Sequence, residues 1–204
     1  MPTESPVPGL PILNAALETD PRRTCLDAEK TDRRVRKTRQ RLQAGLLLLM
    51  KEKPLGQITM REICRRVDVG RSTPYAHYRD VQDILEQMED AFHNDLAALL
   101  PAWPATGGAA DKERWFSAFY ALAQQNGLLL DVLLSHNGDP AFLSRVEALC
   151  EAGITEALPA GSPNPAWRAA FLTGAVLAMV RQWAGGGCTE APAELARMTM
   201  AFLG

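Results

Sequence analysis

The stretch from residue 58 to residue 85 restricts the possible folds of this chain more than any other part of the sequence. Its first half carries four apolar side chains at helical spacing, namely Met60, Ile63, Cys64 and Val67. This spacing predicts a short helix with one buried stripe. Thr59 stands directly before the stripe, where its hydroxyl can cap an unpaired amide of the first helical turn. A tight turn at Gly70 is expected to follow.

The residues after Gly70 are unusually rich in side chains that form hydrogen bonds: Arg71, Ser72, Thr73, Tyr75 and His77. Two short helices joined by a tight turn, with such side chains on the second, form a helix-turn-helix, whose second helix enters the major groove of DNA. Arg71 is the best candidate for reading guanine, because a guanidinium can form two hydrogen bonds with that base. Ser72, Thr73 and Tyr75 are short or rigid enough to contact phosphates, base edges or thymine methyl groups.

Charge is divided unevenly along the chain. Residues 30–80 contain 14 Lys and Arg against 5 Asp and Glu, a net charge of +9. The remaining residues contain 8 against 19, a net charge of −11, although the whole chain is close to neutral at −2. This division favours contact with nucleic acid at one end of the molecule only.

Several residues of this stretch resemble the DNA-binding domain of tetracycline-repressor-type (TetR family) transcriptional regulators. They are Ile58-Thr59 with Ile63, Val69, Ser72-Thr73 with Tyr75 and His77-Tyr78, and the downstream Ile84-Leu85. The resemblance covers roughly residues 32–90. It implies a sequence-specific regulator, more in keeping with a repressor than with an activator, that a small-molecule effector releases from DNA. It also implies a homodimer, whose two-fold symmetry would match a palindromic operator on double-stranded DNA.

The predicted DNA contacts combine the motif with the cations beside it. Thr59 and Arg61, near the start of the second helix, can each reach a phosphate, and a cation at a phosphate releases condensed counterions. By resemblance, Tyr75 and His77 face the DNA backbone. The complete set is Arg36, Lys37, Thr59, Arg61, Arg71, Ser72, Thr73, Tyr75 and His77.

Two residues depart from the family pattern. Pro74 stands where the family usually has Phe or Leu, and a proline at the fourth position of a helix begins to remove a helix hydrogen bond. Val81 stands where many members have a phosphate-binding lysine. These departures leave an alternative open, namely a protein-interaction module on the same fold that has lost specific operator binding.

The periodicity of the chain predicts an all-α fold of about nine helices. Prolines predict a disordered tail over residues 1–30, followed by a three-helix DNA-binding domain over residues 31–79, whose first helix runs from near Thr31 to about Glu52. Gly45 inside that helix predicts close approach of another helix. Residues 80–204 are expected to form a helical ligand-binding and dimerisation domain. Its helices are predicted at 80–100, 111–126, 127–136, 140–158, 164–185 and 190–203.

The last two predicted helices are apolar on nearly all sides, which requires burial on more than one face. By resemblance, they pair with the same helices of a second subunit. The candidate interface residues are Phe171, Gly174, Ala178, Leu195, Met198 and Phe202. An ordinary monomer core is the alternative.

Six aromatic side chains are candidates for lining a pocket for a small apolar or amphipathic effector: Trp103, Trp115, Phe119, Phe142, Trp167 and Trp183. The resemblance implies such a pocket, whereas aromatics at helical spacing are more typical of plain core. An effector that shifts the helix at 80–100 would change the affinity for DNA. Oxidation of Cys150 or Cys188 is an alternative mechanism of sensing.

Neither an enzyme nor a metalloprotein is predicted, and no cofactor is expected. The sequence contains no glycine-rich phosphate loop, H-E-x-x-H motif or nucleophile elbow. Neither His93 nor His136 has a second histidine or a cysteine three or four residues away. The four cysteines form no C-x-x-C pair, which favours a reduced cytoplasmic protein. The longest apolar run, residues 169–180, is shorter than the ~20 residues required to cross a bilayer, so no membrane partner is expected.

Overall fold

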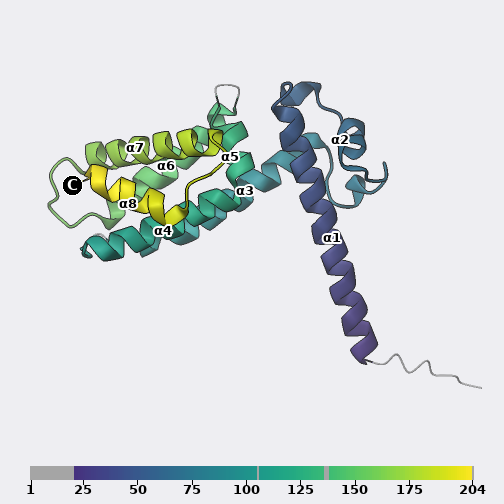
Figure 1. Cartoon of the computed structure of the whole chain (residues 1–204), viewed down its shortest axis with the longest axis horizontal. Helices are drawn as coiled ribbons and strands as arrows, with labels where there is room; N and C mark the ends of the chain where they lie inside the picture. The colour runs from purple at the N-terminus through teal and green to yellow at the C-terminus, as the bar shows by residue number, and fades with distance from the viewer. Residues whose placement is uncertain (1–20, 105, 136–137, 204) are drawn as a thin grey trace, which may run out of the picture. The chain divides into compact units, whose positions relative to one another are not determined.

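The computed structural model describes residues 21–104, 106–135 and 138–203 (Figure 1). These residues form eight α-helices and three 3₁₀ turns and contain no strand, so the fold is all-α as predicted. The helices are α1 (Pro21–Met50), α2 (Met60–Val67), α3 (Val81–Leu99), α4 (Ala109–Gln125), α5 (Gly127–Leu133), α6 (Pro140–Ala157), α7 (Pro165–Gly185) and α8 (Pro192–Leu203). The 3₁₀ turns are η1 (Leu55–Gln57), η2 (Pro74–Ala76) and η3 (Leu100–Ala102). His136 lies outside the described residues.

Helix α1 begins earlier than the sequence analysis predicted. It starts at Pro21 rather than near Thr31, and residues 1–20 lie outside the described residues. A proline is accepted at the first helical position, where its missing amide hydrogen has no helix partner, and the Arg, Leu, Ala, Glu and Lys that follow favour a helix. The chain divides into two units, residues 1–37 and 38–204, and α1 runs through their boundary.

Helix α2 is too short to be stable in isolation, so packing against α1 must support it. Its predicted stripe is buried at Met60, Ile63 and Cys64, whereas Val67 is half-buried. Helix α1 in turn buries four leucines, Leu42, Leu46, Leu47 and Leu49. A β-carbon added to Gly45 would lie 3.4 Å from Cγ2 of Ile63 and closer still to Val67. The predicted close approach at Gly45 is therefore confirmed.

The second helix of the predicted helix-turn-helix is reduced to the 3₁₀ turn η2, which accounts for eight α-helices where about nine were predicted. Thr73 donates its amide to the carbonyl of Gly70 at 3.0 Å, and His77 and Tyr78 donate theirs to the carbonyl of Pro74 at 2.8 and 2.9 Å. Pro74 is buried and has no amide hydrogen to continue this pattern. The segment therefore stays turn-like over residues 71–79.

Helices α3 to α8 form the second group of elements, held by two main helix pairs. Helix α4 packs along α8, and α6 packs along α7, as Figure 1 shows. Tyr120 of α4 is fully buried, and its hydroxyl lies 2.7 Å from the hydroxyl of Thr199 in α8. Helix α3 contributes a buried stripe of Ile84, Leu85, Phe92 and Leu96. None of the described helices is long and apolar enough to cross a membrane.

Candidate nucleic-acid interface and cavity

A capping box fixes the start of α2. The Thr59 hydroxyl accepts from the amide of Glu62 at 3.3 Å, and the Glu62 carboxylate accepts from the Thr59 amide at 3.0 Å. Lys53 pairs with the same carboxylate at 2.8 Å. Hydrogen bonds from Lys53 and then from Thr59 lower the pKa of Glu62 to about 2. The predicted cap is confirmed, and it engages the hydroxyl to which the sequence analysis also assigned a phosphate contact.

The turn after α2 is held by α1. Asp68 ends the helix in the left-handed conformation at φ 50°, which aspartate tolerates better than most residues. Arg41 of α1 donates to the backbone carbonyls of Val67 and Asp68, the second at 3.2 Å. The Arg41 guanidinium is therefore occupied by hydrogen bonds to the turn, and these bonds position the segment that follows.

The segment 71–78 presents some side chains outward and anchors others. Tyr75 is 63% exposed, and Arg71 and Ser72 are also exposed. Thr73 and His77 are half-buried. The predicted contact residues after Gly70 thus lie on one short segment, and three of them are exposed.

Tyr78 anchors that segment to α1. Its ring is buried, and the Arg39 guanidinium carbon lies 5.6 Å from the ring centre, within the range of a cation–π contact. Arg39 Nε also donates to the Tyr78 hydroxyl at 3.4 Å, while Nη2 donates to Gln87 of α3 at 2.7 Å. One guanidinium therefore links α1, the η2 segment and α3.

The cations from Lys53 to Arg79 fall into two classes. Lys53, Arg66 and Arg79 are paired with carboxylates, for example Arg66 with Glu52 at 2.8 Å. By contrast, Arg61, Arg65 and Arg71 are exposed and form no ion pair or side-chain hydrogen bond within the described part of the chain. We call these three residues the unpaired cations.

Sequence reasoning missed Arg65. It is four residues after Arg61 and therefore lies on the same face of α2, and this spacing is the signal that would have found it. Arg36 and Lys37, also predicted as DNA contacts, belong to the unit of residues 1–37, where both are exposed.

The start of α3 is braced by two carboxylates. Asp80 accepts from the amide of Asp83 at 2.8 Å, as expected of an N-cap. The buried Asp83 carboxylate accepts from the Arg79 amide at 2.7 Å, from the Arg79 guanidinium at 3.2 Å and from Gln87 at 3.2 Å. The Arg79 amide is the largest cause lowering the pKa of Asp83. These bonds join the end of the 71–79 segment to the first turn of α3.

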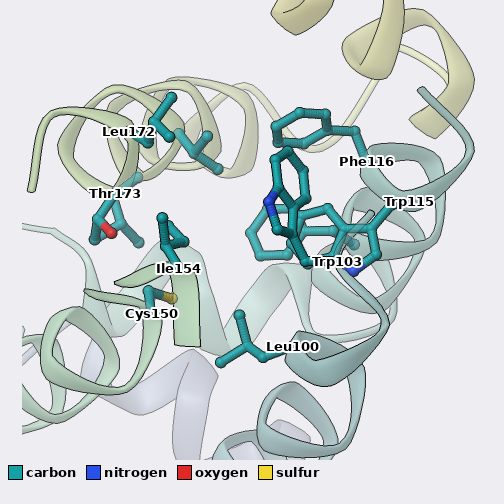
Figure 2. Close-up of a pocket in the computed structure, with 11 residues that line it drawn as sticks. Leu100, Trp103, Trp115, Phe116, Cys150, Ile154, Leu172 and Thr173 are labelled. Atoms are coloured by element: carbon teal, nitrogen blue, oxygen red, sulfur yellow. The ribbon is translucent and has the colours of Figure 1, made fainter. Parts of the chain in front are cut away.

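An apolar cavity of about 40 Å³ lies among η3, α4, α6 and α7. Of the predicted pocket residues, Trp103, Trp115 and Phe119 line it. The full lining is Leu100, Trp103, Trp115, Phe116, Phe119, Cys150, Ile154, Leu172, Thr173, Val176 and Leu177. Figure 2 shows the Trp and Phe rings on one side and Thr173, Ile154 and Cys150 on the other.

The other three predicted pocket residues lie elsewhere. Phe142 is buried in the core against Phe92, with ring centres 6.0 Å apart. Trp183 is buried edge-on against Tyr120 at 5.8 Å. Trp167 is 80% exposed on α7. Helical periodicity identified these residues as apolar positions but did not indicate which of them face the cavity.

Cys150 and Cys188, the candidates for oxidant sensing, do not readily form thiolates. Burial raises the pKa of the Cys150 thiol to about 12, and burial is also the main cause raising the pKa of Cys188. The reactive form of cysteine is the thiolate, so both shifts oppose such a role. Among the described residues, no three His, Cys, Asp or Glu side chains gather into a metal-binding group.

A groove of about 490 Å³ between α7 and α8 is lined by four of the six predicted dimer residues, but not by Phe171 or Gly174. Ala178, Leu195, Met198 and Phe202 line the groove. Phe171 and Phe202 are 70% and 77% exposed, unusually high for phenylalanine. Leu195 differs from the others because it is buried and packs in the core of the chain.

Comparison with known proteins yields matches only among solved structures. No protein-family model matches the sequence, and no curated protein matches it. A transcriptional regulator of the TerR/AcrR family from Aquifex aeolicus VF5 superposes with a TM-score of 0.57 at 16% identity, covering 81% of this chain and 97% of the other.

Two further structures agree with this match. The regulator FadR from Bacillus subtilis, solved in complex with stearoyl-CoA, gives a TM-score of 0.56 at 13% identity, with 80% and 96% coverage. A TetR transcriptional regulator from Streptococcus agalactiae 2603V gives 0.51 at 20% identity, with 86% and 98% coverage. The chain therefore has the all-α fold of TetR-type transcriptional regulators.

Proposed function

We propose that this protein is a sequence-specific DNA-binding transcriptional regulator of the cytoplasm, a repressor that a small-molecule effector releases from its operator. The observation that carries the proposal is the exposure of the unpaired cations Arg61, Arg65 and Arg71 and of Tyr75. Phosphate contact would satisfy these cations and release counterions. Because Arg39 and Arg41 hold the turn and Tyr78 in place, the presented residues are preorganised.

In this proposal, the unpaired cations divide into two roles. Arg61 and Arg65 on α2, together with Arg36 and Lys37, contact phosphates, which fixes the position on DNA without reading sequence. Arg71 reads a guanine, and Ser72, Thr73, Tyr75 and His77 contact the backbone or base edges beside it. Thr59 acts mainly as the cap of α2, since its hydroxyl is engaged with Glu62.

The active form in this proposal is a homodimer. The exposed Phe171 and Phe202 and the groove between α7 and α8 support pairing with the same surface of a second copy. Small residues at Gly174 and Ala178 let a partner helix approach closely. Two-fold pairing would present two 71–78 segments to a palindromic operator.

Fluorescence anisotropy with DNA from upstream of the protein's own gene tests the proposal. The titration is run over a range of salt concentrations and with random competitor DNA. Tight binding that resists competitor and weakens steeply with salt is the expected result. Binding that competitor removes completely, at this DNA and across a genomic library, would contradict sequence-specific regulation.

A protein-interaction module on the same fold is the second candidate. The observation that favours it is the replacement of a recognition helix by the 3₁₀ turn η2 at Pro74. Such a module would bind all DNA weakly and equally, through its cations alone. The competitor experiment therefore separates the two functions.

A further inference from the structure

The residues that line the cavity include a threonine whose hydroxyl is unpaired among the described residues. Thr173 is 3% exposed and lines the cavity, and its Oγ1 has no hydrogen-bond partner among the described residues. A buried hydroxyl without a partner is unfavourable, and native structures seldom retain one without a reason. The indole N–H of Trp115 is already satisfied, because Nε1 donates to the Leu99 carbonyl at 3.2 Å.

The lining carries no charge. It consists of apolar and aromatic side chains together with Thr173 and Cys150, whose thiol burial keeps protonated by raising its pKa to about 12. An anionic or cationic ligand would therefore lose its hydration without gaining an ion pair, which is strongly unfavourable. A ligand of this cavity must be uncharged.

The wall opposite Thr173 is aromatic. Trp103 and Trp115 meet edge to face with ring centres 4.9 Å apart, and Trp103 meets Phe116 in the same way at 5.4 Å (Figure 2). Trp115 stacks on Phe119 with an interplanar angle of 11°. A further planar ring can join such a cluster by either geometry.

The cavity is small. Its volume of about 40 Å³ exceeds the about 10–15 Å³ that one water requires, but it is far below the space for a long acyl chain. Trp103 is half-buried on the segment that follows η3, so it is the wall residue placed to move outward for a single ring.

We propose that this cavity binds a small, uncharged, single-ring aromatic compound with one hydrogen-bonding group, which pairs with the Thr173 hydroxyl. The inference rests on the proposed function for its meaning, since the compound would be the effector. The ligand would press on Leu100, the residue directly after α3, which is already packed closely against Gly153 of α6. Binding would thus act on the end of the helix that leads back to the 71–79 segment.

The test measures ligand binding without DNA, by calorimetry on the full chain. Phenol is the probe, toluene is its counterpart without the hydroxyl, and benzoate is the charged control. The wild-type protein should bind phenol more tightly than toluene and should not bind benzoate. Failure to bind phenol, or equal binding of phenol and benzoate, would overturn the proposal.

Variants at position 173 test the hydroxyl itself. Thr173→Val has nearly the same shape and should weaken phenol binding about threefold to tenfold while leaving toluene within twofold. Thr173→Ser should keep the preference for phenol. Equal losses for both ligands in Thr173→Val would refute the pairing, and the wild-type comparison decides the ligand class even if a variant does not fold.

These results are independent of operator binding. If phenol binds as expected and no operator is found, the cavity proposal stands and the regulator proposal fails. If the operator binds and phenol does not, the regulator proposal stands and the cavity proposal fails. Release of a bound operator by phenol in the anisotropy assay would join the two proposals.

Discussion

A β-carbon placed on Gly45 would lie 2.6 Å from Cγ1 of Val67, closer than two carbon atoms can pack. Helix α1 therefore meets α2 at a point where only glycine fits. Val67 is β-branched and has little freedom to rotate away. The position of α2, and of the turn that follows it, thus depends on the absence of a side chain at Gly45.

Gly45→Ala should destabilise the protein by about 1–2 kcal/mol, because overpacking outweighs the helix propensity gained. Chemical denaturation measures the change. Gly56→Ala is the matched control, since a β-carbon there meets nothing within 4 Å. Adding Val67→Ala to Gly45→Ala should cost less than the two single changes together. Full additivity would mean that the contact does not limit the packing.

Glu62→Gln should change how stability depends on acid. The pKa of Glu62 is lowered to about 2 in the folded protein, from an ordinary 4.5. The ionised carboxylate therefore contributes stability above about pH 4.5, and this contribution is lost as the pH falls toward 2. The variant should lack that part of the acid dependence in denaturation curves. Glu113→Gln, at a carboxylate without an ion pair in the described residues, should keep it.

Glu89→Gln should change the pH dependence of stability in the opposite direction. Glu89 of α3 is 5% exposed, and its Oε1 has no partner among the described residues. Burial, followed by the charge of Asp139, raises its pKa from 4.5 to about 7, although Arg145 lies 3.8 Å away. The folded state then holds a proton that the unfolded state releases, so stability falls as the pH rises from about 4.5 to about 7.

Glutamine cannot ionise, so the Glu89→Gln protein should be more stable than the wild type above pH 7, by up to about 3 kcal/mol. At pH 4.5 the two proteins should be similarly stable. Thermal unfolding across this range measures both. Parallel pH profiles would show that the Glu89 carboxylate is well solvated or well paired in solution.

Arg71→Ala should relax the base preference at one operator position, with a cost of about 1–3 kcal/mol at the preferred base. Tyr75→Phe should weaken binding to all sequences about equally, because only a backbone contact is lost. Anisotropy titrations against a set of single-base operator variants separate the two patterns. A uniform loss in both proteins would refute the reading role of Arg71.

Phe171→Glu should shift the protein from dimer to monomer, since two-fold pairing would bury two carboxylates near each other. Light scattering coupled to size exclusion reports the mass. Thr155→Glu, at an exposed residue of α6, should leave the mass unchanged. A Phe171→Glu protein that keeps the mass of a dimer would place the interface elsewhere.

The sequence was most informative where a local pattern and a local bond coincide. The cap at Thr59 was predicted, because its bond joins residues close in the chain. The contact at Gly45 was anticipated from the cost of glycine in a helix, but its partner was not identified. Periodicity marks an apolar residue without naming its neighbour.

The incorrect predictions also arise because the sequence does not show which residues contact each other. Trp167 and Trp115 are equally apolar, yet only the packing of distant helices decides that one is exposed and the other lines the cavity. The short η2 turn follows from Pro74, which the sequence analysis noticed as a departure without predicting the loss of the helix. The helical start at Pro21 was missed because prolines were read only as helix breakers.

The single guanidinium of Arg39 touches both Tyr78 and Gln87, and Asp83 ties the amide of Arg79 to the same turn of α3. These bonds hold the 71–79 segment tightly against the start of α3. Helix α3 continues from it without a break for 19 residues, a length of about 28 Å. A small tilt of α3 at Leu100 would therefore strain the hydrogen bonds of Arg39, Arg79 and Asp83 at the other end of the helix. If the proposed function holds, α3 can transmit a displacement from the cavity to the 71–79 segment without a hinge loop.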